Sequence, residues 1–213
     1  KLHLIGTKKA IPLREYIGTK VGTDYYLDSV AGGVGTFQPI FHIDMFISLV
    51  GQNDQGKFEL LVGSPAQADK MLGTKSPFAL NEVYDSISKS LADLGFLVKR
   101  NPLVHRPTLG RSVALSDLRK IASQPGGDAL MVAVNELSAT GATDNSIVRV
   151  RDWHHITWNN CLVENSVSQG KHVYLPTFGW GEYADLKAID LEMKSIWETL
   201  GFTVHMLGDF NEF

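Results

Sequence analysis

The sequence predicts an α/β fold built as one catalytic-type domain over 1–213. Two patterns favour this class. Short apolar runs rich in β-branched and aromatic residues are typical of buried strands, and they alternate with stretches whose apolar residues recur every three or four positions, as in amphipathic helices. No low-complexity tract or long linker divides the chain, so we expect a single domain.

The first strong strand signal is the apolar run 39–50, and its composition predicts a mostly buried strand. The polar stretch 51–56 begins and ends with glycine and predicts a hairpin loop. The run 58–62 then predicts the returning strand. Together the three stretches predict a β-hairpin.

Two Ser-Pro pairs predict helix starts, because serine caps a helix and proline is tolerated at its first position. The pair at 64–65 leads into a helix over 66–72, and the pair at 76–77 opens a longer one. Gly95 closes the longer helix. Its apolar positions share one face: Val83, Ile87, Leu91 and Leu94.

The remaining elements continue the alternation. The sequence predicts strands over 96–104, 128–137, 146–151, 156–164, 171–175 and 202–207, and helices over 115–122 and 183–200. The stretches 94–98 and 200–204 are similar, since each reads Leu-Gly-Phe, then one residue, then Val after an amphipathic helix. This echo indicates a repeated module of strands and helix, although helix-to-strand connections often look alike.

Composition excludes several classes of protein. The net charge is −3, from 20 basic and 23 acidic residues, so we expect no nucleic-acid partner. No apolar run reaches the roughly 18 residues that a membrane span needs, so no membrane partner is expected either. The single cysteine, Cys161, excludes an internal disulfide framework and a multi-cysteine zinc module.

His42 and Asp44 are the most informative polar residues, because they interrupt an apolar strand-like run. Residues two apart on a strand share a face, so both side chains would project toward one pocket. Burying a histidine and an aspartate is costly unless they have a partner or a task. The alternatives are that they meet solvent where the strand ends or satisfy each other.

Other candidates are weaker. The glycine-rich loop 32–35 lacks the lysine of a phosphate-binding loop and leads into a strand, which favours a flexible connection. Neighbouring His154 and His155 would point to opposite faces of a strand, so we expect no metal site and no cofactor. Cys161 lies in an apolar run and is expected to be a buried, unreactive core residue.

Three segments, taken in order, resemble the deiminase branch of the guanidino-group-modifying (pentein) superfamily, which includes protein-arginine and agmatine deiminases. Residues 41–50 with 58–65 resemble the His-x-Asp strand and the hairpin after it. Residues 159–164 with 173–179 are similar to the paired strands ahead of the final helix. Residues 200–210 resemble the last helix end and strand. The match covers about 38–213, loosely in its middle.

The resemblance implies an α/β propeller of ββαβ modules, incomplete in this chain, and a hydrolase that converts a guanidino group to a ureido group and ammonia. It implies that His42 is the general acid and base, and that Asp44 is both catalytic and substrate-binding because it accepts hydrogen bonds from the guanidinium. The implied partner is a small guanidino compound or an arginine-containing peptide. An amidinotransferase and a non-catalytic remnant are the alternatives.

The chain departs from the family pattern in two places. The family carries a further aspartate upstream of the His-x-Asp motif, and residues 1–38 show no counterpart. The family's nucleophilic cysteine follows the final strand, whereas Cys161 matches a different position. We therefore expect this sequence to be a fragment of a deiminase, inactive alone, whose nucleophile is not present in this chain.

Overall fold

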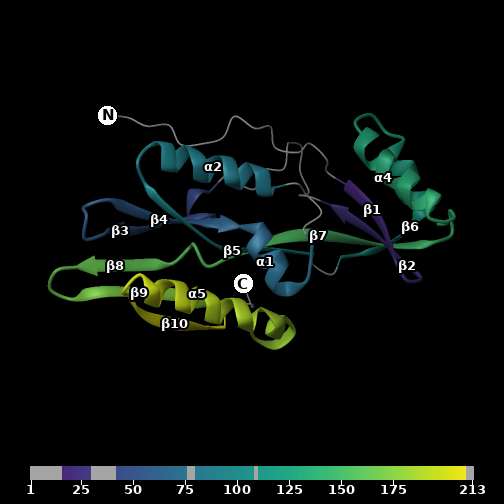
Figure 1. Cartoon of the computed structure of the whole chain (residues 1–213). Coiled ribbons are helices and arrows are strands. Elements are labelled where there is room, and N and C mark those ends of the chain that lie inside the picture. The colour runs from purple at the N-terminus through teal and green to yellow at the C-terminus, as the bar shows by residue number, and fades with distance from the viewer. Residues whose placement is uncertain (1–15, 30–41, 76–79, 108–109, 210–213) are drawn as a thin grey trace. The chain divides into compact units, whose positions relative to one another are not determined.

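The computed structural model describes residues 16–29, 42–75, 80–107 and 110–209, without the side chains of 152–154 and 209, and confirms a mixed α/β fold (Figure 1). The chain divides into two compact units. Unit 1 comprises 1–10, 39–104 and 155–213, and unit 2 comprises 11–38 and 105–154. The assignment of 1–213 to one catalytic-type domain stays a prediction.

Unit 1 contains two repeats of the same topology. In the first repeat, β3 (Ile47–Gln52) pairs antiparallel with β4 (Phe58–Ser64), and β5 (Leu97–Pro107) returns parallel to β4. The connection from β4 to β5 carries α1 (Pro65–Leu72) and α2 (Asn81–Asp93). This is a ββαβ arrangement with an additional helix, and its hairpin turns at 53–57, close to the predicted loop 51–56.

The second repeat of unit 1 has the same strand order and directions. Strand β8 (Leu162–Ser166) pairs antiparallel with β9 (Gly170–Thr177). The 3₁₀ segment η2 (Gly181–Leu186) and helix α5 (Lys187–Thr199) then lead to β10 (Thr203–Asp209), which is parallel to β9. The described residues do not show a closed propeller, so the propeller stays a prediction.

Local signals explain where the helices of unit 1 start and stop. The Ser64 side chain accepts a hydrogen bond from the Gln67 amide, 3.4 Å away, and Pro65 is the first helical residue, as predicted. The second Ser-Pro pair, 76–77, lies outside the described residues. Gly95 and Gly201 follow α2 and α5 with φ of 96° and 84°, a left-handed conformation that glycine adopts without strain.

The core of unit 1 joins its two repeats. Trp158 and Trp197 are fully buried, whereas Trp180 is 44% exposed, with the Lys187 ammonium 4.4 Å from its ring centroid. The buried members of this core come from both repeats and the chain between them: Val50, Leu61, Ala68, Val104, Trp158, Val173, Leu175, Leu186, Ile189, Met193, Trp197, Leu200 and Phe202.

Unit 2, in its described residues, combines a small sheet with two helices. Strand β1 (Tyr16–Val21) pairs antiparallel with β2 (Asp24–Ser29), and β2 lies parallel to β7 (Ile147–Thr157). The short strand β6 (Ser112–Ala114) pairs antiparallel with β7. Arg151 on β7 forms a two-pronged ion pair with the buried Asp28 opposite it, at 2.7 and 2.9 Å.

The helices of unit 2 are α3 (Leu115–Ala122) and α4 (Asp128–Ala139). The predicted helix 115–122 is confirmed, but the predicted strand 128–137 is wrong because α4 occupies it. The buried residues of α4 explain the helix, since they recur at helical spacing: Leu130, Ala133, Val134 and Leu137. No helix in the described part of the chain is long and apolar enough to cross a membrane.

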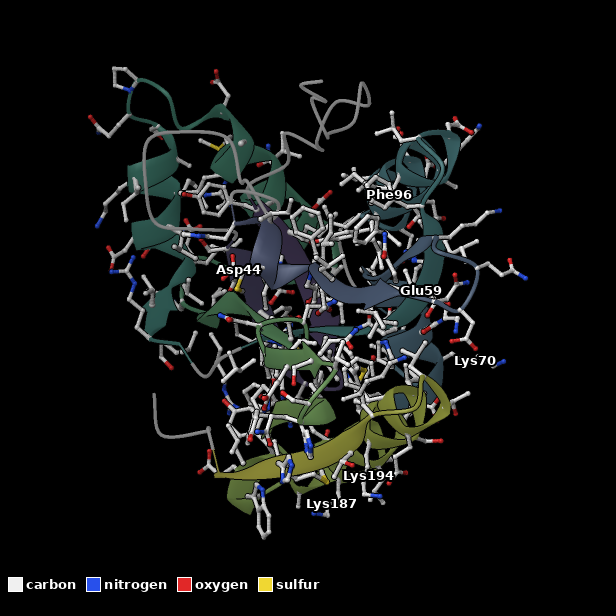
Figure 2. The ribbon with its side chains drawn as sticks, turned by 90° about the vertical axis from the view of Figure 1, so that its left-hand side faces the viewer. Asp44, Glu59, Lys70, Phe96, Lys187 and Lys194 are labelled. Carbon is white, nitrogen blue, oxygen red and sulfur yellow. The ribbon has the colours of Figure 1, made fainter. Side chains whose placement is uncertain are left out.

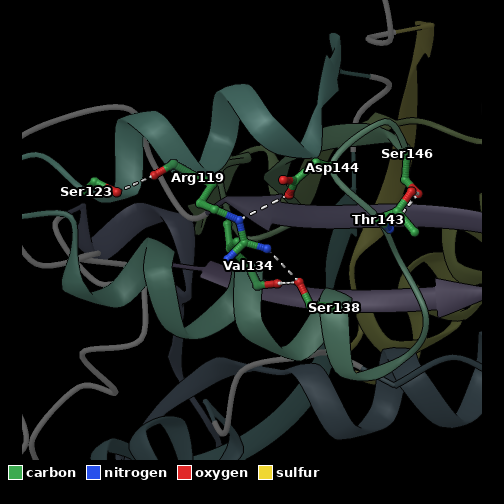
Figure 3. Close-up of polar contacts among 7 residues, drawn as sticks. All are labelled: Arg119, Ser123, Val134, Ser138, Thr143, Asp144 and Ser146. Atoms are coloured by element: carbon green, nitrogen blue, oxygen red, sulfur yellow. Dashed lines mark hydrogen bonds and ion pairs between the residues drawn. The ribbon is translucent and has the colours of Figure 1, made fainter.

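Arg119 ties α3 to α4 and to the turn that follows it (Figure 3). Its guanidinium donates to the Asp144 carboxylate at 3.2 Å and to the Ser138 hydroxyl at 3.0 Å. The turn is closed by Thr143, whose amide donates to the Ser146 hydroxyl at 2.9 Å. These hydrogen bonds hold the residues immediately before β7 against α3 and α4.

Candidate functional site

The His42–Asp44 segment forms a 3₁₀ turn and not a strand. His42 is the extended N-cap of η1 (Ile43–Met45), and β3 begins only at Ile47. The Met45 amide donates to the His42 carbonyl at 3.2 Å, which closes the turn. The prediction of one strand over 39–50 is therefore wrong; residues 39–41 lie outside the described residues.

Phe46 explains why the chain turns here. Its ring is 5% exposed and lies edge-on to Tyr84 at a centroid distance of 5.7 Å, while Ile43 is 54% exposed. The Phe46 carbonyl also accepts a hydrogen bond from the Gly63 amide at 2.8 Å. An apolar run alone could not reveal this turn, because turn and strand can both anchor one large ring in the core.

The turn nevertheless brings the two predicted site residues together. His42 Nδ1 lies 3.8 Å from Asp44 Oδ1, and the side chains are 63% and 54% exposed (Asp44 is labelled in Figure 2). The expectation that the pair projects from one strand into a pocket is wrong, since both side chains meet solvent. The catalytic and substrate-binding roles of the pair stay a prediction.

The electrostatic interaction energy available at the exposed His42–Asp44 pair is modest. Two unit charges at about 4 Å interact by roughly 1 kcal/mol in bulk water and by several times more near a protein surface. The Asp44 carboxylate can accept hydrogen bonds from a planar cation such as guanidinium, and the nitrogens of the His42 imidazole can donate or accept hydrogen bonds. An enclosed site would strengthen both interactions.

A buried polar network lies behind this turn, and sequence reasoning missed it. The Ser48 hydroxyl on β3 donates to the Asn159 carbonyl at 2.7 Å, and the Asn159 amide group donates to the Ser48 oxygen at 3.2 Å. Asn159 also exchanges hydrogen bonds with Asn101, and its side-chain oxygen accepts one from the Thr157 hydroxyl. The only available signal was two asparagines next to apolar runs.

Cys161 touches the edge of this network. Its thiol lies 3.9 Å from the Ser48 hydroxyl, in hydrogen-bonding range for sulfur, and burial raises the pKa of the Cys161 thiol to about 11. The residue is only partly buried and precedes β8. It lines a groove of about 470 Å³ with Asn160, Leu162, Tyr174, Pro176 and Leu207. A thiol with this pKa is almost wholly protonated at neutral pH.

A second buried group, Asp190 on α5, fixes the connection between β9 and that helix. Its carboxylate is fully buried and accepts three hydrogen bonds, from the Trp158 indole at 2.9 Å, the Phe178 amide at 3.0 Å and the Gly179 amide at 2.9 Å. These contacts satisfy the buried charge within the protein. Asp190 therefore has a structural role, because it holds the segment after β9 against α5.

The structure does not test most of the weaker sequence candidates. The glycine-rich loop 32–35 and the side chain of His154 lie outside the described residues. Within the described part of the chain, no three histidine, cysteine, aspartate or glutamate side chains converge as a ready-made metal cluster.

Comparison with known proteins gives no family assignment. No protein-family model matches the sequence, and a search of the curated proteins finds no significant match.

Proposed function

We propose that this chain is part of a deiminase that hydrolyses a guanidino group to a ureido group and ammonia. His42 is the general acid and base, and Asp44 holds the guanidinium by charge-assisted hydrogen bonds. The substrate is a small guanidino compound, such as agmatine or arginine, or an arginine-containing peptide. The observation that carries the proposal is the His42–Asp44 contact of 3.8 Å on a turn open to solutes.

The topology of unit 1 supports the same assignment. The resemblance implies ββαβ modules, and unit 1 contains two consecutive arrangements of antiparallel pair, helix and parallel third strand. The turn with His42 and Asp44 directly precedes β3, the first strand of the first repeat. Many functions can share a topology, so this support concerns the family and not the reaction.

The proposed reaction needs a nucleophile other than Cys161. Guanidinium is resonance-stabilised and a poor electrophile, so the proposed route uses a thiolate and a covalent intermediate. Burial disfavours the Cys161 thiolate at neutral pH. Cys161 is the one cysteine of the sequence, and the proposal therefore places the nucleophile on a longer protein that contains this chain.

A second candidate function is guanidinium binding without catalysis. The exposure of His42 and Asp44 and the raised pKa of the Cys161 thiol favour it for the 213-residue chain taken alone. Both candidates share the Asp44 contact, and they differ in whether covalent chemistry follows.

Ligand titration of the ¹⁵N-labelled chain tests the shared contact. Agmatine and N-acetylarginine amide should shift the amide resonances of 42–46, whereas butylamine, a cation without a guanidinium, should not. Asp44→Asn should remove the shifts. Asp54→Asn, which changes an exposed carboxylate in the β3–β4 loop, should retain them.

Two outcomes contradict the proposal. Equal shifts with butylamine would show that the turn attracts any cation, and undiminished shifts in Asp44→Asn would remove Asp44 from the substrate-binding role. The amino-acid changes in this experiment affect exposed side chains, so loss of folding is not expected to obscure the result.

A further inference from the structure

The sheet of the second repeat carries two histidines on the face turned away from the core. Val173 and Leu175 of β9 are fully buried, so the alternate residues His172 and Tyr174 project from the opposite face. His205 of β10 pairs in register with Tyr174 and lies on that same face.

One ring nitrogen of each histidine faces a ring nitrogen of the other. His172 Nδ1 lies 3.0 Å from His205 Nε2, and His172 Nε2 lies 2.9 Å from the Gln169 carbonyl oxygen. A carbonyl can only accept, so His172 Nε2 carries a proton. In the neutral pair, His172 Nδ1 is then the bare acceptor and His205 Nε2–H donates to it.

Both rings are held in this orientation by their neighbours. The His205 ring lies at a centroid distance of 5.3 Å from the His172 ring, with 22° between the ring planes, and it stacks nearly parallel on the Tyr174 ring at 4.7 Å. The Gln169 carbonyl fixes the His172 ring from its far nitrogen. A metal-binding histidine characteristically donates its second ring N–H to such a carbonyl or to a carboxylate.

We propose that His172 Nδ1 and His205 Nε2 together bind a divalent transition-metal ion of the Zn²⁺ type, for which imidazole is a suitable ligand. Zn–N bonds of about 2.0–2.1 Å in tetrahedral geometry place two ligand nitrogens about 3.4 Å apart, so the pair needs to open by only about 0.4 Å. His205 moves its proton from Nε2 to Nδ1, and the metal takes the place of that shared proton.

Water and one carboxylate complete the coordination. Glu164 of β8 lies directly opposite His172 in the register and therefore on the same face of the sheet. Since no three potential ligands converge in the described residues, the site has two preset ligands and takes up its carboxylate on binding. Its affinity is therefore lower than that of a closed structural zinc site.

Calorimetric titration of the 213-residue chain with ZnCl₂ tests the site. We expect saturable binding of one ion at this site, with affinity lowered at least about tenfold in His172→Gln and in His205→Gln. Glu192→Gln serves as the control, because it removes an exposed potential ligand from α5 and should leave this binding event unchanged. Circular dichroism verifies that each variant is folded.

Ring ¹⁵N–¹H correlation spectra of the unmodified chain give a second readout that a purely structural pair would not change. Zn²⁺ should move the His205 ring proton from Nε2 to Nδ1 while the His172 Nε2–H remains. The absence of saturable binding, a zinc affinity in both glutamine variants equal to that of the unmodified chain, or an unchanged His205 tautomer with zinc bound would each overturn the proposal. Should a variant not fold, the spectra decide alone.

Discussion

Asn101 and Asn159 face each other in the core of unit 1 and exchange two side-chain hydrogen bonds. The Asn101 amide donates to the Asn159 oxygen at 2.9 Å, and the Asn159 amide donates back at 3.3 Å. The residues are 0% and 3% exposed. Asn101 belongs to β5 of the first repeat, and Asn159 precedes β8 of the second. The pair therefore cross-links the two ββαβ repeats.

Asn159→Ala should lower the free energy of unfolding by about 2–3 kcal/mol, because it removes the buried side-chain hydrogen bonds to Asn101, Ser48 and Thr157. Urea denaturation followed by circular dichroism measures the change. Asn160→Ala is the matched control: the neighbouring asparagine is exposed, and its loss should stay within about 0.5 kcal/mol. Equal effects of the two changes would show that the network adds nothing.

Asp190→Asn should also destabilise unit 1, by about 2–3 kcal/mol. The change replaces one carboxylate oxygen by an NH₂ group, which faces an N–H donor from Trp158, Phe178 or Gly179 in either orientation. Thermal and urea unfolding measure the loss. Glu192→Gln makes the same chemical change at an exposed position of the same helix and should be nearly neutral.

Secondary structure was predictable where the signals were local. The Ser64-Pro65 cap defines the start of α1, and the spacing of Leu115 and Leu118 indicates α3 without tertiary information. Helix α4 was missed because its apolar residues run without a break from 129 to 134 and resemble a buried strand. Burial of one stripe, including Ala133 and Leu137, distinguishes the helix.

The candidate site was predictable only in part. The residue types and spacing of His42 and Asp44 identified the pair, and the structure brings the two side chains together. Their exposure was not predictable, because it depends on Phe46 reaching Tyr84, 38 positions away in sequence. The partners of Asn159 and Asp190 are likewise distant in sequence or on other elements, so neither network leaves a local pattern.

Cys161 should react slowly with thiol reagents at neutral pH. Burial raises the pKa of its thiol to about 11, and the thiolate is the reactive form. Below this pKa the thiolate fraction rises about tenfold per pH unit, so the rate with iodoacetamide should still be rising between pH 9 and 10. An ordinary exposed thiol levels off in that range because its pKa is about 8.5. A rate that is already constant at pH 9 would contradict the burial argument.

In a longer protein that contains this chain and a nucleophilic cysteine, substitutions of His42 and of Asp44 should change different kinetic parameters. Asp44→Ala should lose most activity and raise KM, because the guanidinium loses a charged partner. His42→Ala should mainly lower kcat, by roughly 10²–10⁴-fold, the usual contribution of a positioned acid–base group. Steady-state assays of ammonia release separate the two effects. Near-normal rates in both variants would remove the pair from the mechanism.

The 213-residue chain alone should not turn over a guanidino substrate. A covalent route needs a thiolate at the guanidinium carbon, and the only thiol, Cys161, is almost fully protonated at neutral pH and contacts Ser48 rather than His42 or Asp44. The purified chain should therefore release no ammonia or ureido product from agmatine, arginine or an arginine-containing peptide. Turnover abolished by Cys161→Ser would identify Cys161 as the nucleophile after all. Turnover that survives Cys161→Ser would exclude a cysteine-based covalent route, because the chain would then contain no thiol.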